Sequence, residues 1–393
     1  MLESFWTALT LGGGYNAVVV MTGLGALGAA AGPVGAFMIL KQRPLLADAV
    51  AHATLPGVAA GFLLALFLTG DGRQPAFLLL GAAASGATAA GAMHFLKDGA
   101  RIGEDAATAA ALSVSFGLGV ALLSLIQALP TGGQAGLNAY LLGQAAAMTG
   151  AEAWTAAIVG AAALAILALL FKELAAAAFD PIAAQAQGLP VRALDLATTT
   201  LMLALVAAGL RAVGLVLILA LLVTPAAAAR FWTDRLPRLA LLAALFGGGG
   251  AYAGGALSAA APGLPTGALI VAILSGVFAF SLMFAPKRGA VSAAMRRLTL
   301  RRILARQGVL AAMTTGRPPA KPGLARRLGW IDATGAQTLA GAAAAAQWAW
   351  EESLRARYLD ERPDEASRIL AANRPLREIL SRDMIAELER GRP

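Results

Sequence analysis

Apolar stretches separated by short polar or Gly/Pro-rich breaks fill the first three quarters of the chain. A helix crosses a bilayer core of about 30 Å with roughly 20 mostly apolar residues. The pattern therefore predicts an all-α polytopic membrane protein, with residues 2–11 as an interfacial helix rather than a cleaved signal. The nine predicted spans lie near 15–40, 45–68, 75–96, 106–128, 152–171, 192–210, 212–230, 239–261 and 264–286.

Charge divides the chain into two parts. Residues 1–286 hold 22 charged residues of balanced sign, whereas residues 287–393 hold 31, of which 20 are basic. Over the whole chain 13% of residues are charged, against about 25% in soluble domains, which argues against an ordinary water-soluble enzyme. Together with a mean hydropathy of +0.70, this predicts a transmembrane domain over 1–286 and a basic, helical, cytoplasmic tail over 287–393.

The short connections between predicted spans differ in basic residues. Cytoplasmic loops are enriched in Lys and Arg, so the richer side indicates the cytoplasm. This predicts an extracytoplasmic N-terminus and a cytoplasmic C-terminus. The loop charges and the basic tail then indicate the same cytoplasmic side, and this agreement requires an odd number of spans. One side has Lys41, Arg43, Lys97, Arg101, Lys172, Arg192, Arg230, Arg235 and Arg238, and the other has Arg73 and Arg211.

A carboxylate and an imidazole occur together inside the second predicted span. Asp48 and His52 are four residues apart and share one helix face. His52 lies roughly 12 Å beyond Pro44 along the helix, where a charge costs about 2.5–3.5 kcal/mol on insertion scales. Oxygen and nitrogen ligands suit Mn²⁺, Fe²⁺ or Zn²⁺. The pair is therefore a candidate metal site in a transport path; the alternative is an Asp–His contact that binds no ion.

Pro56 and Gly57 follow this pair within the same span. Proline removes a helical hydrogen bond, and broken helices at membrane depth line protein or water-filled cavities. Transporter helices that are interrupted in this way commonly frame ion sites. We therefore expect the helix to weaken or break at Pro56 and Gly57.

The remaining polar positions give weaker signals. His94, Arg192 and Asp195 lie at span ends and are interpreted mainly as interface groups, with an Asp195 that faces the bundle as the alternative. The chain has no cysteine and no Gly-Lys-Ser/Thr sequence, which excludes thiolate metal sites and a P-loop, so it cannot hydrolyse ATP by that route. Candidates to line an outer entry path are Asn16, Asn138, Tyr140, Gln144 and Glu152.

Three stretches resemble one family in order and spacing. The first is Arg43-Pro44-Leu45-Leu46-Ala47-Asp48 through His52 to Leu55-Pro56-Gly57. The second is Phe179-Asp180-Pro181 through Gln185 to Gly188-Leu189-Pro190, and the third runs from Val213-Gly214 to Pro225-Ala226-Ala227. Together they resemble the metal ABC transporter permeases that import manganese, zinc or iron, over about residues 15–286. Ala47, where many relatives have glycine, and the weakly charged residues 184–187 depart from the family pattern.

The resemblance implies the following roles. Asp48 and His52 become a transient binding pair for a divalent metal that is the substrate, with no permanently bound cofactor. Residues 180–190 become a coupling helix, so that Phe179, Asp180, Pro181 and Gly188 belong to the contact with an ATPase subunit that binds ATP. The other partners are a second permease subunit, identical or paralogous, and an extracytoplasmic metal-binding protein, in a bacterial inner membrane. Leu55-Pro56-Gly57 favours manganese or iron over zinc.

The tail leaves several interpretations open. Its order of helix, turn and helix over 317–358 distantly resembles the winged-helix region of iron-dependent repressors. Its basic residues also suit a face near anionic membrane lipid or a docking role on the ATPase, and nucleic acid is not an expected partner. The alternatives for the whole chain are a secondary metal/proton transporter and a membrane-tethered regulator that uses the tail.

Overall fold

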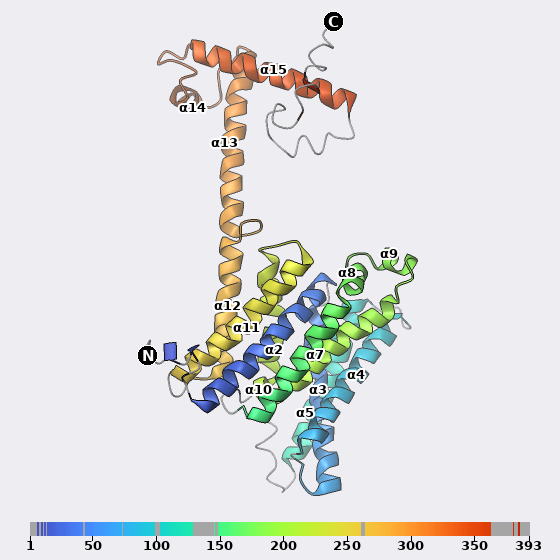
Figure 1. The fold of residues 1–393 in the computed structure, drawn as a ribbon. Helices are drawn as coiled ribbons and strands as arrows, with labels where there is room; N and C mark the ends of the chain where they lie inside the picture. The colour runs from blue at the N-terminus through green and yellow to red at the C-terminus, as the bar shows by residue number, and fades with distance from the viewer. Residues whose placement is uncertain are drawn as a thin grey trace. The chain divides into compact units, whose positions relative to one another are not determined.

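A computed structural model provides the three-dimensional structure (Figure 1). It divides into two compact units, residues 1–292 and residues 293–393, which are described separately. The residues described are 6–7, 9–10, 12, 14–41, 44–72, 74–98, 103–128, 145, 148–260, 264–362, 380 and 384–385.

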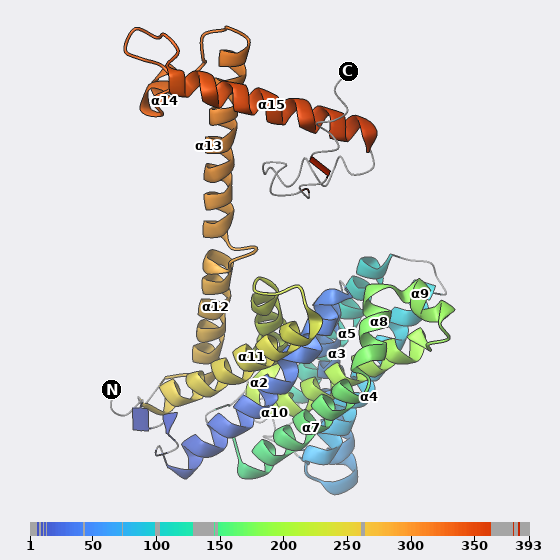
Figure 2. The same cartoon turned by 45° about the horizontal axis from the view of Figure 1, so that its top comes forward.

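The first unit is a bundle of helices (Figures 1 and 2). Eight of the described helices are long and apolar enough to cross a membrane, and the described residues contain no named strand. The prediction of an all-α polytopic membrane protein is therefore confirmed. The elements are α2 (Tyr15–Leu40), α3 (Pro44–Thr69), α4 (Pro75–Asp98), α5 (Glu104–Gln127), α7 (Gly150–Leu169), α8 (Phe171–Phe179), α9 (Pro181–Ala186), α10 (Val191–Arg230), α11 (Leu236–Ala260) and α12 (Thr266–Phe284).

Element α10 contains two of the nine predicted spans. Its backbone is not helical at Gly214, where φ is 76° and ψ is 169°, a region that glycine enters without steric penalty. A Cβ atom on Gly209 would lie 2.9 Å from Cδ1 of Ile218, although nine residues of straight helix would separate them by about 13 Å. The chain therefore bends sharply at Gly214. Its second part, Val216–Arg230, is a shorter apolar helix than the eight, at about 22 Å.

Helix α2 packs against α10, α11 and α7 in the middle of the bundle. Its side chains Leu24, Leu27 and Phe37 are fully buried. A methyl group at Gly28, Gly32 or Gly35 would overlap the main chain of Gly247, Ala243 or Leu222, respectively. The helix backbones are therefore in direct contact, which small residues permit in membrane bundles.

Two sets of ion pairs join connections at the ends of the bundle. Lys41, after α2, lies 2.7 Å from Asp195 near the start of α10. Asp234, between α10 and α11, lies 2.7 Å from Arg288, after α12. Both sets join segments that the predicted topology places on the basic, cytoplasmic side. Figure 1 shows α8 and α9 at one end of this unit and the turn between α3 and α4 at the other.

The second unit is built around the distal part of α13 (Ala290–Thr314), α14 (Pro322–Arg327) and α15 (Leu339–Glu361). A small core of Val309, Ala325 and Ile331 holds them together, and Ile331 pairs with Gln337 in an isolated antiparallel bridge. In the turn between these two residues, the Thr334 hydroxyl and the Ala336 amide donate to Asp332 and hold the pKa of its carboxyl below the usual value.

Gly247 and Gly249 provide a matched test of the helix contact. We expect Gly247→Ala to destabilise the bundle by about 1–3 kcal/mol, because its methyl group would meet the backbone of Gly28. Gly249, two residues on in α11, has no neighbouring atom within 4 Å of the point that a methyl group would occupy, so Gly249→Ala should be neutral. The measurement is the apparent melting temperature of each purified variant in detergent. Equal melting temperatures for the two variants would contradict this packing.

Candidate functional site

Asp48 and His52 lie side by side on α3, as their spacing predicts. Nε2 of His52 is 3.5 Å from Oδ1 of Asp48, and the two side chains are 26% and 43% exposed, respectively. The intervening residues Ala49 and Ala51 are fully buried. The buried alanines fix this part of α3 in the bundle while the polar pair keeps an accessible side.

Helices α4 and α5 form the surroundings of the pair. The ring of Phe116, from α5, meets the ring of His52 edge to face at a centroid distance of 5.2 Å. Ser85, from α4, donates its hydroxyl to the carbonyl of Ala53 at 2.5 Å. Nδ1 of His52 is buried and has no hydrogen-bond partner within the described part of the chain. Sequence reasoning missed Phe116 and Ser85, because neither has a local signal that connects it to α3.

Of the two outcomes expected at Pro56 and Gly57, a break in the helix is wrong. Helix α3 continues through both residues to Thr69. Pro56 is tolerated because buried neighbours surround it, among them Gly119 of α5, where a Cβ atom would lie 3.1 Å from the Pro56 ring. Gly57 instead lets α4 approach, since a methyl group there would overlap the carbonyl of Gly81. Pro56 still deprives the His52 carbonyl of its regular helical donor.

Among the described residues, this face of α3 offers two ligands, Asp48 and His52. The described ranges contain no group of three or more His, Cys, Asp or Glu side chains that could hold a metal. Resident structural zinc takes four protein ligands, and catalytic zinc usually takes three. An Asp–His pair with an accessible side is therefore suited to brief contact with a cation rather than to permanent retention.

The segment after α8 is a short, well-defined turn of helix. The Asp180 carboxylate caps α9 by accepting hydrogen bonds from the amides of Ile182 and Ala183, and Pro181 occupies the first helical turn. The chain leaves α9 through Gly188, whose φ is 81°. Phe179 and Ile182 are 65% and 80% exposed. The segment thus presents an apolar surface on a fixed backbone.

A shielded ion pair ties this region to the start of α3. The Lys41 ammonium donates to Asp195 at 2.7 Å and to the Thr198 hydroxyl at 3.0 Å. The Lys41 side chain is only 8% exposed and the Asp195 side chain is 22% exposed. Asp195 is the fifth residue of α10, close after the α9 segment, and Lys41 is seven residues before Asp48. Asp195 is therefore more than an interface charge.

The other polar residues singled out in the sequence lie in different environments. Glu152 forms a capping box with Thr149 at the start of α7. Asn16 lines a cavity of about 270 Å³ together with Ser258 and Thr266. His94 is half-buried near the end of α4 and is not brought to His52 by any contact that the structure describes. Asn138, Tyr140 and Gln144 lie outside the described residues.

Comparison with known proteins identifies the family. The model of the ABC 3 transport family matches residues 15–285. The chain belongs to this family. It is 38% identical to the manganese transport system membrane protein MntC of Bacillus subtilis over 80% of this chain and 70% of that protein. It is 39% identical to the zinc transport system membrane protein TroC of Treponema pallidum, over 72% and 93%.

A solved structure agrees with this assignment. PsaBC from Streptococcus pneumoniae in complex with Fab superposes with a TM-score of 0.63 and 28% identity, over 77% of this chain and 100% of that chain. The resemblance to metal ABC transporter permeases is thereby confirmed. The chain is a transport component and a multi-pass protein of the bacterial plasma membrane.

Asp195 and Asp234 provide a matched pair of carboxylates for a stability test. Asp195→Asn leaves the buried Lys41 without its carboxylate partner, so we expect a loss of about 3 kcal/mol, the low end for a broken buried pair. Asp234→Asn removes an equally short pair that is about half exposed, and should cost less than about 1 kcal/mol. Apparent melting temperatures in detergent should fall in that order. A larger fall for Asp234→Asn would contradict the assigned burial.

Proposed function

We propose that the chain is the permease subunit of an ATP-driven importer of a divalent transition-metal cation. The observation that carries the proposal is the Asp48–His52 pair, on the accessible side of a helix whose other side is fully packed. Family membership supports the ATP-driven class, and the names of the relatives include manganese and zinc systems. Manganese or iron is the favoured cargo, from the Leu55-Pro56-Gly57 sequence, and zinc is the next candidate.

The pair would bind the cation transiently during transport. A carboxylate oxygen and a neutral imidazole nitrogen are both good ligands for first-row divalent ions. Two protein ligands leave most of the coordination shell to water, so that binding is weak enough to be reversible. Phe116 limits how far the imidazole can rotate, because its ring meets the ring of His52 edge to face. Asp48 then supplies the charge and His52 the selectivity for softer cations over Mg²⁺ and Ca²⁺.

Energy for transport would come from partner subunits. An ATPase subunit binds ATP and docks on the segment formed by Phe179, Asp180, Pro181 and Gly188, in the cytoplasm of an N-out, C-in topology. A second permease subunit, identical or paralogous, completes the path, and an extracytoplasmic protein delivers the metal. Residues 1–286 form the membrane domain and 287–393 the cytoplasmic tail. The exposed side chains of Phe179 and Ile182 support docking, since contiguous apolar surface marks protein interfaces.

Metal uptake tests the function. In cells with the complete transporter, we expect Asp48→Ala and His52→Ala to lower uptake of one among Mn, Fe and Zn by at least about tenfold, because each removes a ligand. His94→Ala is the matched control, since it removes the only other histidine and should leave uptake unchanged. Uptake is compared at equal membrane abundance. Full uptake in both ligand variants would reduce the pair to a structural contact.

The partner ATPase separates the alternatives. Inactivating its ATP-binding lysine should abolish uptake if transport is ATP-driven. Uptake that persists, and that depends instead on the proton gradient, would favour the secondary transporter.

The docking segment has its own test. Ile182→Ser removes an 80% exposed apolar side chain and should lower the amount of ATPase that copurifies with the permease by about tenfold, as for an interface anchor worth more than 1 kcal/mol. Gln187→Ser, in the same segment, should leave copurification unchanged. Equal recovery of ATPase with both variants would place the contact elsewhere.

A further inference from the structure

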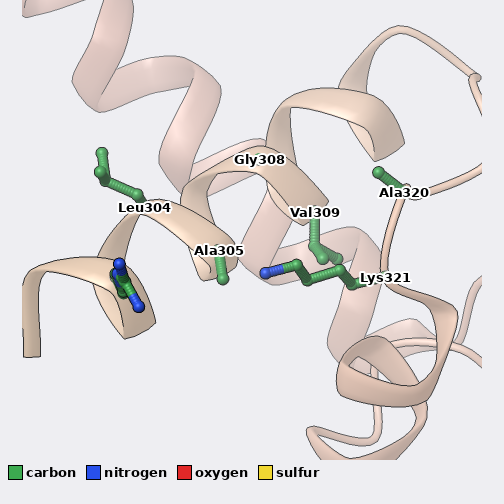
Figure 3. Close-up of a pocket in the computed structure, with 7 residues that line it drawn as sticks. Leu304, Ala305, Gly308, Val309, Ala320 and Lys321 are labelled. Carbon is green, nitrogen blue, oxygen red and sulfur yellow. The ribbon is translucent and has the colours of Figure 1, made fainter. Parts of the chain in front are cut away.

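The second unit has a groove along α13 that the proposed function does not use. Two adjoining cavities, of about 580 Å³ and about 670 Å³, share Arg301, Ala305 and Lys321. Figure 3 shows Leu304, Ala305, Gly308 and Val309 on the α13 side, facing Ala320 and Lys321 across the opening. The groove thus lies between α13 and the residue that precedes α14.

The side chains that line the groove carry positive charge. Arg301, Arg302, Arg306 and Lys321 line it, and none of the described residues that line it is acidic. None of these four cations forms an ion pair or hydrogen bond with another described residue. By contrast, Arg355 of α15 pairs with Glu352. Four unpaired cations around one opening create a positive potential that attracts an anion.

Apolar side chains form the rest of the wall. Leu298 and Leu324 line one cavity, and Leu304 and Val309 line the other. Leu298 and Leu304 are 54% and 55% exposed, which leaves apolar surface in contact with water. A small inorganic anion would not cover that surface. A ligand with a phosphate next to a hydrocarbon part would match both the charges and the walls.

The position of α13 in the sequence, shortly after the last membrane helix, indicates the membrane as the source of such a ligand. Helix α13 begins at Ala290, after a connection of five residues from the end of the last membrane helix at Phe284. Lys and Arg clusters just beyond a membrane span on the cytoplasmic side bind anionic lipids. Nucleic acid is a poorer match, because protein–DNA interfaces are more polar than this groove and would leave the exposed Leu298 and Leu304 uncovered.

We propose that the groove formed by Arg301, Arg302, Arg306 and Lys321 binds the phosphate headgroup of an anionic phospholipid of the inner leaflet. The guanidinium and ammonium groups hold the phosphate, and the leucines cover the adjoining hydrocarbon. The tail is thereby docked on the membrane surface in a manner that depends on lipid composition. The proposal rests on a cytoplasmic tail and not on the identity of the transported metal.

The cysteine-free chain allows a direct test. The full-length variant Thr314→Cys, with a donor dye at the end of α13, is placed in lipid nanodiscs that carry an acceptor dye on a headgroup. Energy transfer should rise when phosphatidylglycerol is mixed into phosphatidylcholine. Adding Arg301→Gln and Lys321→Gln should lower the docked-to-free ratio roughly 25-fold, since each basic residue near an anionic surface contributes roughly a factor of five.

The control is Arg317→Gln with Arg327→Gln, which removes the same charge from exposed positions outside the groove and should retain energy transfer. Equal loss in both double variants would overturn the groove in favour of net charge. Inorganic phosphate that abolishes docking at millimolar concentration, while lipid composition has no effect, would overturn the lipid as ligand. Salt-sensitive binding of duplex DNA that requires Arg301 and Lys321, without lipid dependence, would likewise overturn it.

Discussion

Direct contact between helix backbones is the constraint on which the bundle depends. Inside a bilayer, lipid chains compete with side chains for apolar contact, so helices associate through close packing of small residues. Gly28, Gly32 and Gly35 recur along α2 and meet the main chains of α11 and α10. Gly57 and Gly81 allow the same kind of backbone contact between α3 and α4. The second contact fixes the helix that carries Asp48 and His52, and it explains why Pro56 and Gly57 do not interrupt that helix.

Carboxylates in the membrane unit differ in how their charge is satisfied. Asp195 meets Lys41 at 2.7 Å, and Asp234 meets Arg288 at the same distance. Asp180 accepts two amide hydrogen bonds at the start of α9. Asp48 lies 3.5 Å from a histidine that is charged only when protonated. Among these four carboxylates, Asp48 has the least compensated charge, and it lies on the exposed side of α3. This contrast supports the proposed ion path.

The sequence predicted what is local and missed what is not. Helix lengths follow from runs of apolar residues, so the predicted 15–40 agrees with Tyr15–Leu40, and i, i+4 spacing was enough to place Asp48 beside His52. The turn at Gly214 divides α10 into two helices of unequal length, which the sequence did not predict. A single glycine does not reveal whether a chain bends or reverses. Phe116, Ser85 and the Lys41–Asp195 pair depend on contacts between helices far apart in sequence, for which one sequence has no signal.

The shielded pair also constrains how motion could pass through the proposed transporter. Asp195 is in the second turn of α10, shortly after the docking segment, and Lys41 follows the end of α2, shortly before α3 begins. Displacing the docking segment must either carry the α2–α3 connection with it or separate the two charges. Separation would leave an ammonium that is 8% exposed without its carboxylate, at a cost of several kcal/mol. Joint movement is therefore favoured, and it delivers the displacement to the helix that holds Asp48 and His52.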